Sequence, residues 1–357
     1  MSKHIDSKSS KNVFHVSLVC RRVEHDYFKY HPMPEITDWM WLMVKDHPDL
    51  VTVVDYGRTH ENRTISLLKV TKEHRAEGPV WMDCGIHARE WIAPAFCQYF
   101  VRQILQTSKT DPKMELMMKN LDFYVTPVFN VDGYVYSWKD NTVSTRLWRK
   151  NRSASPPGCD CQGTDLNRNF DSNWGTAGVS SNCCRESYCG TAPMSEPETQ
   201  FLTYFVGTRK DDFLCFLTIH SFGQMLLVPY GHPNFTASNY AELMEVALAA
   251  AEAIQEVHGM IYKVLKPSDI LNPFSGSSQD WAHMLGIPLT FTFELRDNGT
   301  FGFELPEDQI QPACEEAYSG VLHIITYAHD KAFNAATTAA AVWTLLLAAG
   351  TTAVSLM

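Results

Sequence analysis

The sequence contains no Lys/Arg-rich run, no internal repeat and no low-complexity core segment. Its 30 Lys and Arg are outnumbered by 40 Asp and Glu, and the resulting net charge of −10 argues against a nucleic-acid partner. No linker divides the 357 residues, of which 45% are hydrophobic, enough for a substantial core. We therefore expect one domain over residues 27–330.

The N-terminus lacks a convincing signal peptide. Its apolar stretch, Val13–Cys20, is short and is interrupted by His15. The residues before this stretch are polar and rich in Ser and Lys. We expect residues 1–26 to be poorly ordered.

The C-terminus lacks charge. Residues Ala339–Met357 contain no charged side chain and follow the small residues Asn334, Ala335 and Ala336. A hydrophobic tail behind small residues resembles the attachment signal of a lipid anchor, which is removed from the mature protein. A tail-anchoring helix and a frayed terminus are the alternatives for residues 331–357.

Ten cysteines and four Asn-x-Ser/Thr sequons favour a secretory history. The sequons begin at Asn62, Asn151, Asn234 and Asn298. These signs conflict with the missing signal peptide. Our hypothesis is an extracellular or cell-surface protein whose N-terminus is incomplete or mis-started in this sequence.

Apolar runs alternate with amphipathic ones along the chain. Buried strands are predicted at Ile65–Val70, Val80–Cys84, Phe123–Phe129, Phe213–Ile219 and Leu289–Leu295. Helical spacing is found in Glu90–Gln106, Glu196–Thr208, Tyr240–His258 and Gln309–His329. Buried strands separated by helices predict an α/β sandwich with helices on both faces of a mostly parallel or mixed sheet. The segment Asn141–Pro193, rich in Ser, Gly, Asn and Cys, is predicted to be mostly loop.

One short motif carries chemistry. His87 and Glu90 follow the apolar run Val80–Cys84, where a strand is predicted to end. An imidazole and a carboxylate three residues apart suit two ligands of one Zn²⁺ ion. Such a pair also occurs by chance, so the prediction depends on a third ligand elsewhere.

Three further clusters can complete a site. His220 closes one predicted strand, and Glu294 ends another, where a carboxylate is costly without a role or partner. The arginines of Arg146–Arg149 and Asn167–Phe170 can bind carboxylates and stabilise an oxyanion. Taken singly, these residues are more often a strand-end histidine, an ion pair between Glu294 and Arg296, and solvated loop charges.

Together the clusters resemble those of the zinc metallocarboxypeptidases of the pancreatic A/B type, from about Tyr27 to Ala328. The motifs that carry the resemblance are Asp83–Ile92, Arg146–Arg149, Thr164–Phe170, Thr218–Ser221 and Phe293–Asp297. The resemblance implies a single-domain α/β/α sandwich around a mixed, mostly parallel eight-stranded sheet. It also implies one zinc ion per chain and removal of the C-terminal residue of peptides.

The resemblance assigns the metal site residue by residue. His87, Glu90 and His220 would bind zinc. Asp165 would accept the outer ring N–H of His87 and so fix the tautomer of that histidine.

The resemblance also assigns the reacting groups. Glu294 would take the proton of the attacking water and later protonate the leaving amine, while Arg149 would stabilise the oxyanion. Asn167 and Arg168 would hold the terminal carboxylate of the substrate, with Arg89 on its approach path. This carboxylate anchor predicts cleavage at the C-terminus rather than inside a chain.

Several substrate-binding positions depart from the family. Asn272 stands where the family has a mobile tyrosine, which predicts weaker substrate binding rather than lost chemistry. Phe222, which follows Ser221, replaces another tyrosine and lacks its hydroxyl. Gln279, at the expected pocket floor, is neutral where the family has an apolar residue, an acid or an arginine. With the bulky Phe274 it predicts a narrow pocket that favours polar neutral or acidic side chains and cleaves basic ones poorly.

The cysteines follow the family in part. Cys84–Cys97 and Cys161–Cys184 match family disulfides. Cys189 matches a third family position, but its usual partner position is Gly175. The two extra cysteines, Cys159 and Cys183, are each possible partners of Cys189.

Two other local features are predicted. Cys215, in an apolar strand, and Cys314, at the start of a helix, are expected to be buried thiols. The resemblance also implies cis peptide bonds before Phe222, Tyr230 and Asp297.

The sequence thus predicts an active zinc exopeptidase, monomeric, with peptide or protein C-termini as substrates. The alternative is a surface-anchored, catalytically weakened binding protein that keeps the fold. Asn272 and Phe222 support the alternative. The complete set of metal, arginine and Glu294 positions opposes it.

Overall fold

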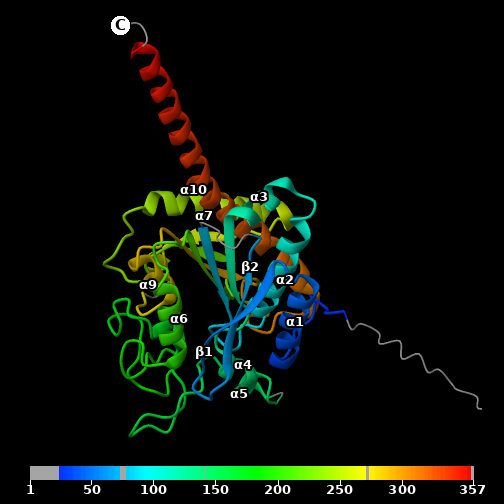
Figure 1. Cartoon of the computed structure of the whole chain (residues 1–357). Coiled ribbons are helices and arrows are strands. Elements are labelled where there is room, and N and C mark those ends of the chain that lie inside the picture. The colour runs from blue at the N-terminus through cyan, green and yellow to red at the C-terminus, as the bar shows by residue number, and fades with distance from the viewer. Residues whose placement is uncertain (1–23, 73–77, 141, 271–272, 355–357) are drawn as a thin grey trace, which may run out of the picture.

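The computed structural model describes residues 24–72, 78–140, 142–270 and 273–354 (Figure 1). Most of the segment predicted to be poorly ordered, and Asn272, lie outside the described residues. The described part begins before the predicted domain boundary at residue 27. His25 already packs there, because its Nε2 lies 2.8 Å from the Gln98 amide oxygen and its ring contacts Trp39.

An eight-stranded sheet forms the centre of the molecule. Its strands are β1 Val51–Arg58, β2 Thr64–Val70, β3 Gly78–Cys84, β4 Leu121–Thr126, β5 Cys215–Ser221, β6 Met225–Leu227, β7 Lys263–Leu265 and β8 Leu289–Leu295. The strand order is β1-β2-β4-β3-β5-β8-β6-β7. Four of the neighbouring pairs are parallel (β3–β4, β3–β5, β5–β8 and β6–β7) and three are antiparallel, so the predicted mixed sheet is confirmed.

Helices cover both faces of the sheet, as predicted (Figure 1). One face carries α1 Met33–Asp46, α2 Ile92–Thr107, α3 Pro112–Asn120, α4 Val131–Ser137, α7 Tyr240–His258 and α10 Ile310–Val354. The other face carries α6 Pro197–Gly207 and α9 Ser278–Met284. The predicted loop region contains only α5 Val143–Arg146 and the 3-10 helix η1 Leu166–Arg168, and two further short helices are α8 Pro267–Ile270 and η2 Glu307–Gln309.

Strand alternation decides which face receives the polar side chains. Phe291 and Phe293 of β8 belong to the core under α7 and α10, whereas Phe216 of β5 belongs to the core under α6 and α9. Since successive side chains of a strand point to opposite faces, His220 and Glu294 both project on the α6/α9 face.

The sheet topology brings these side chains to one edge. From β3 the strand order runs to β4 on one side and to β5 on the other, and this reversal is where α/β sheets bind ligands. β3, β5 and β8 are parallel, so their carboxyl ends coincide. His220 and Glu294 are register partners there.

Some predicted elements needed correction. The predicted helix Gln309–His329 is longer, because α10 continues to Val354 and projects beyond the other elements (Figure 1). The predicted strand Phe123–Phe129 begins at Leu121 and already ends at Thr126, where the chain turns towards α4. Among the described residues, no helix is both long and apolar enough to cross a bilayer.

Candidate active site

Three buried side chains form a compact cluster of metal-ligating type. His87 and Glu90 follow β3 in a tight loop, and His220 is the second-last residue of β5. His87 Nδ1 lies 2.8 Å from Glu90 Oε1, and His220 Nδ1 lies 3.0 Å from Glu90 Oε2. The two Nδ1 atoms are 3.2 Å apart. We call His87, Glu90 and His220 the ligand set.

The loop after β3 is held from outside. Gly85 has φ 68°, which a residue with a side chain rarely adopts, and it lets the chain turn at the end of the strand. The side-chain amide of Asn130 then donates to the carbonyl oxygens of Ile86 and Lys150, each at 3.1 Å. These bonds fix the backbone that carries His87.

The buried groups of the ligand set shift one another's pKa values. Burial would raise the pKa of Glu90, but the two imidazoles outweigh it and hold this pKa below its usual range. Burial lowers the pKa of His87, and Arg149 lowers it further. One candidate ligand atom from each of the three residues lies within 4.8 Å of the others. Two imidazole nitrogens and one carboxylate, buried and convergent, fit Zn²⁺ with one coordination position left open.

Asp165 lies behind the ligand set, as predicted. Its Oδ1 is 3.1 Å from His87 Nε2, and its Oδ2 accepts from Arg149 Nε at 3.1 Å and Nη2 at 2.9 Å. Burial would raise the pKa of Asp165, but Arg149 and His87 hold it well below its usual range. Arg149 Nη1 also reaches to 4.0 Å from Glu90 Oε1, so this guanidinium is fixed at the edge of the ligand set.

Glu294 is the one acid of the site with no hydrogen bond or ion pair in the part of the chain that the structure describes. Arg296, the alternative partner considered from the sequence, instead pairs with Glu316. Burial raises the pKa of Glu294 to about 8, against the opposing effect of His220. A cation bound at the ligand set would lower this pKa and favour the carboxylate, the form that acts as a base.

A cavity of about 310 Å³ unites most of the predicted residues. It is lined by His87, Glu90, Arg149, Asn167, Arg168, His220, Ser221, Phe222, Leu227, Phe274, Ser277, Gln279, Thr292, Glu294 and Phe303. Arg89 lines a neighbouring cavity that shares Arg149, and its guanidinium pairs with Glu186 at 3.2 Å.

The segment with Asn167 and Arg168 is a single 3-10 turn. Asp165 accepts from the backbone N–H of Asn167 at 3.0 Å, and the Asn167 side-chain oxygen accepts from the Ser278 backbone N–H at 3.0 Å. The Arg168 guanidinium donates to the Asn167 carbonyl oxygen at 2.7 Å and lies over the Phe274 ring, 4.7 Å from its centroid. Both residues line the cavity.

Gln279 is almost completely buried and its amide group is already engaged. Nε2 donates to the carbonyl oxygens of Leu227 at 2.8 Å and Thr290 at 3.3 Å, while Oε1 accepts from Thr292 Oγ1 at 2.6 Å. Two backbone carbonyl partners leave only one orientation of the amide. The neighbouring Asp280 is turned away and accepts from Gly231 N at 3.0 Å. We call Gln279 and Thr292 the pocket floor.

Four residues that line the cavity were missed from the sequence: Leu227, Ser277, Thr292 and Phe303. Phe303 contacts Phe222 edge to face at 4.9 Å and also lies under Arg89, 4.2 Å from its guanidinium carbon. Thr292, in the expected strand, could have been found by counting two residues back from Glu294, since both point to the same face.

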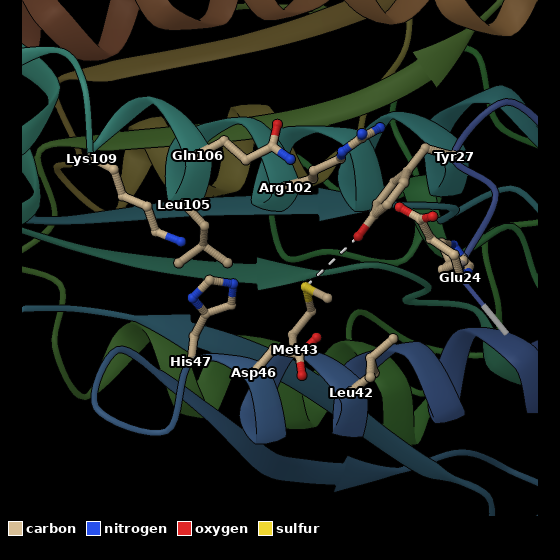
Figure 2. Close-up of a pocket in the computed structure, with 11 residues that line it drawn as sticks. Glu24, Tyr27, Leu42, Met43, Asp46, His47, Arg102, Leu105, Gln106 and Lys109 are labelled. Carbon is tan, nitrogen blue, oxygen red and sulfur yellow. Dashed lines mark hydrogen bonds between the residues drawn. The ribbon is translucent and has the colours of Figure 1, made fainter. Parts of the chain in front are cut away.

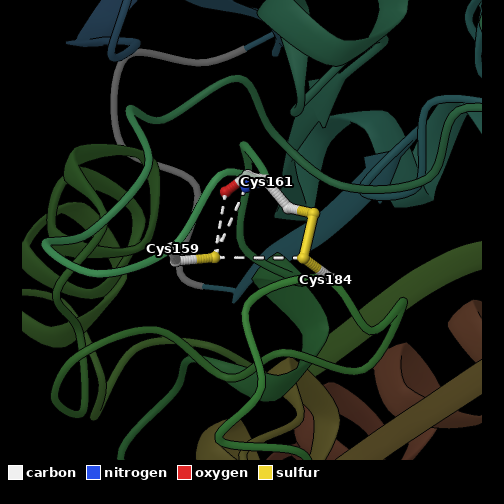
Figure 3. Close-up of side chains that lie close together, drawn as sticks. All are labelled: Cys159, Cys161 and Cys184. Atoms are coloured by element: carbon white, nitrogen blue, oxygen red, sulfur yellow. Dashed lines mark hydrogen bonds between the residues drawn. A yellow bond between two sulfur atoms is a disulfide. The ribbon is translucent and has the colours of Figure 1, made fainter.

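The disulfide prediction was right in part. Cys84–Cys97 and Cys161–Cys184 are confirmed. Cys159 and Cys183 pair with each other, so neither is available to Cys189, which is a buried free thiol like Cys215 and Cys314. Cys159 lies beside the Cys161–Cys184 bridge (Figure 3), and its sulfur is 4.0 Å from that of Cys184. The three cis peptide bonds are also present.

Only some of the sequons are accessible. Asn62, Asn234 and Asn298 are exposed. Asn151 is fully buried and its side-chain amide donates to Glu196 at 2.7 Å. Its use as a glycosylation site is incompatible with this fold.

A second cavity, of about 420 Å³, lies between α1 and α2 (Figure 2). Its wall has side chains of both charges, with Arg102 on α2, Lys109 just beyond the end of α2 and Asp46 at the end of α1. None of the residues predicted for the active site lines it. Its size therefore does not mark it as the catalytic cavity.

Comparison with known proteins identifies the arrangement. The family model described as zinc carboxypeptidase matches residues 36–320. The chain belongs to the zinc carboxypeptidase family. It is accordingly a metallocarboxypeptidase, a hydrolase of peptide bonds.

Relatives of this carboxypeptidase align over most of their length. It is 49% identical to carboxypeptidase O of Bos taurus over 86% of this chain and 81% of that protein. It is 43% identical to carboxypeptidase B of Bos taurus over 86% of this chain and 72% of that protein. A structure of bovine thrombin-activatable fibrinolysis inhibitor, bound to tick carboxypeptidase inhibitor, superposes with a TM-score of 0.79 at 40% identity, covering 85% of this chain and 99% of that one.

Proposed function

We propose that this carboxypeptidase holds one Zn²⁺ ion in the ligand set and removes single residues from the C-termini of peptides and proteins. The observation that carries the proposal is the convergence of two imidazoles and a carboxylate beside Glu294, an acid without a hydrogen-bond or ion-pair partner among the described residues. When bound, zinc supplies a water of lowered pKa and polarises the scissile carbonyl.

The residues of the chain then have separate tasks. Glu294 lines the cavity and has no partner within the described part of the chain, so its carboxylate can take a proton from the attacking water and return one to the leaving amine. Arg149 is fixed by Asp165 at the edge of the ligand set, where its free N–H groups can stabilise an oxyanion. Glu294 and Arg149 are therefore the proposed catalytic residues.

Recognition of the C-terminus is assigned to the 3-10 turn. Arg168 offers the cavity a guanidinium that can bind a carboxylate in bidentate fashion, and its stacking on Phe274 limits its motion. The side-chain amide of Asn167 lies next to it. A free α-carboxylate is present only at the end of a chain, which supports exopeptidase rather than internal cleavage.

The pocket floor favours substrates whose C-terminal side chain is polar and neutral over the acidic side chains that were also predicted from the sequence. Both N–H groups of Gln279 donate to backbone carbonyls, so the floor offers only oxygen acceptors to a substrate. A carboxylate side chain would find no donor there, whereas an amide or hydroxyl side chain would find an acceptor. No carboxylate lines the floor to attract a basic side chain.

The cellular setting is proposed from the cysteines and the sequons. Three disulfides and three exposed sequons support an extracellular or cell-surface location. Lipid anchorage through residues 331–357 and a monomeric state remain predictions.

The deciding experiment is release of the C-terminal residue from a panel of peptides ending in Gln, Glu, Phe and Lys, with and without a zinc chelator. Glu294→Gln serves as the control, because it removes the base and leaves the ligand set intact. We expect zinc-dependent release, fastest for Gln, and a loss of about 10³-fold in kcat for Glu294→Gln. No release from any peptide would favour the alternative of a binding protein, and strong preference for Lys would contradict the proposed pocket.

A further inference from the structure

The two histidines of the ligand set differ in what lies behind them. His87 has the carboxylate of Asp165 directly at its Nε2. His220 has a hydroxyl instead, because Thr218 Oγ1 lies 3.2 Å from His220 Nε2. Nothing in the sequence motifs assigned Thr218 a role.

The hydroxyl of Thr218 is itself held. Its Oγ1 donates to Asp83 Oδ1 at 2.8 Å, and the other oxygen of Asp83 accepts from the indole N–H of Trp81 at 2.9 Å. Asp83, Thr218 and Trp81 are completely buried, so water does not compete for these bonds.

The direction of each bond follows from the groups present. An indole N–H can only donate, and an ionised carboxylate can only accept. The Thr218 hydroxyl must therefore donate its single hydrogen to Asp83, which leaves a lone pair of its oxygen directed at the ring of His220. That lone pair accepts a proton held on Nε2, so the other nitrogen of the ring, Nδ1, is free to bind a metal.

The fold builds this chain of bonds from the sheet itself. Asp83 and Thr218 are register partners on the parallel strands β3 and β5. Side chains two apart on a strand share a face, so Thr218 and His220 project together, as do Trp81 and Asp83.

We propose that Thr218 and Asp83 are positioning residues that fix the ring orientation and the Nε2–H tautomer of His220 for zinc. The inference rests on the zinc site of the proposed function. The competing explanation is that the bond between Thr218 and Asp83 only ties β3 to β5. The two differ in one measurable respect: a purely structural bond would affect folding but not the zinc affinity of the folded protein.

The test compares threonine variants of the full chain by chelator competition for zinc and by thermal unfolding of the zinc-free protein. Thr218→Val removes the hydroxyl at nearly constant volume, and we expect zinc affinity to fall about tenfold, the lower end of what loss of an outer partner costs. Thr218→Ser keeps the hydroxyl and should stay within about twofold of the unchanged protein. Thr290→Val is the matched control, since Thr290 is buried in the adjacent strand β8 and its hydroxyl has no hydrogen-bond partner.

A second variant guards against a folding defect. Asp83→Asn keeps the size of the side chain but lets its amide donate to Thr218, which would turn the hydroxyl hydrogen towards His220 and disfavour the required tautomer. It too should weaken zinc binding about tenfold. Zinc affinity unchanged in both folded variants, with only lower thermal stability, would overturn the proposal. A protein that binds no zinc in any form would overturn the proposed function instead.

Discussion

The ligand set and the pocket floor lie in one cavity but are built on different principles. The ligand set is charged, and each outer imidazole nitrogen contacts a buried partner. The pocket floor is neutral, and its donors are used by backbone carbonyls of β6 and β8. The ligand set gathers charged groups around one point, whereas the pocket floor consists of uncharged groups.

This difference separates two kinds of effect. A change in the ligand set should alter the chemistry that all substrates share, so every peptide should lose activity in the same proportion. A change in the pocket floor should redistribute activity among peptides and leave zinc binding unchanged. Substitutions can test whether the two regions are as independent as this comparison implies.

The largest effect is expected from Glu90→Gln, which removes the charged ligand. Zinc affinity should fall by more than the roughly 100-fold that loss of an outer partner can cost, and all peptides should be affected alike. Zinc content after dialysis and kcat on the four peptides give the measurement. Glu198→Gln, at another buried acid that bonds to Asn151 outside the cavity, is the control. A loss of activity on only one class of peptide would contradict the separation of the ligand set from the pocket floor.

A specificity change is expected from Gln279→Arg. A guanidinium at the floor can form a charge-assisted pair with an acidic side chain, so the ratio of kcat/KM for Glu to that for Gln should rise about 10- to 100-fold. Zinc content should not change. Gln279→Met, which removes the polar groups without adding charge, should leave this ratio within a few-fold. A uniform fall in kcat/KM for all peptides would show that the pocket floor also supports the metal site.

A smaller effect is expected from Phe274→Ala. The Phe274 ring lines the cavity and packs against Gly231, where it leaves no room for a Cβ atom. Its removal should widen the pocket and raise kcat/KM for peptides ending in Phe about tenfold relative to those ending in Gln. Phe235→Ala, at an exposed phenylalanine outside the cavity, is the control. A rise in KM for every peptide would instead show that the ring chiefly holds Arg168.

The smallest effect is expected from Thr292→Val. This change removes the donor to Gln279 Oε1, and one neutral hydrogen bond contributes about 1 kcal/mol. The preference for Gln over Phe should change about fivefold, with Thr292→Ser close to the unchanged protein. A loss of zinc in Thr292→Val would contradict the independence of the two regions.

The sequence was sufficient to predict the ligand set for a physical reason. His87, Glu90 and His220 each follow or end a buried parallel strand, and such ends meet at one edge of the sheet. The partners of His220 could not be found in this way, because Asp83 and Thr218 are 135 residues apart and meet only through the strand register. One signal was available: Asp83, like Glu294, is a carboxylate in an apolar strand, where it needs a partner.

The pocket floor shows that the type of a single residue does not reveal which of its hydrogen-bonding groups a substrate can use. The amide of Gln279 offers donors and an acceptor in isolation, and the sequence does not show which of them remain available. Its partners come from β6 and β8, and two of them are backbone atoms. The pairing of Cys159 with Cys183 was missed for the same reason, since loop geometry rather than spacing decides it.

The register pairing of His220 with Glu294 on adjacent strands fixes the separation between these two residues. Adjacent strands are spaced about 4.8 Å apart whatever their side chains, so the offset between metal ligand and base is set by backbone geometry. A slip by one residue would turn one of the two to the opposite face. Loops and pocket residues can therefore be substituted without changing the distance between the metal ligand and the base. The three central strands would then allow new substrate specificities to evolve around unchanged catalytic chemistry.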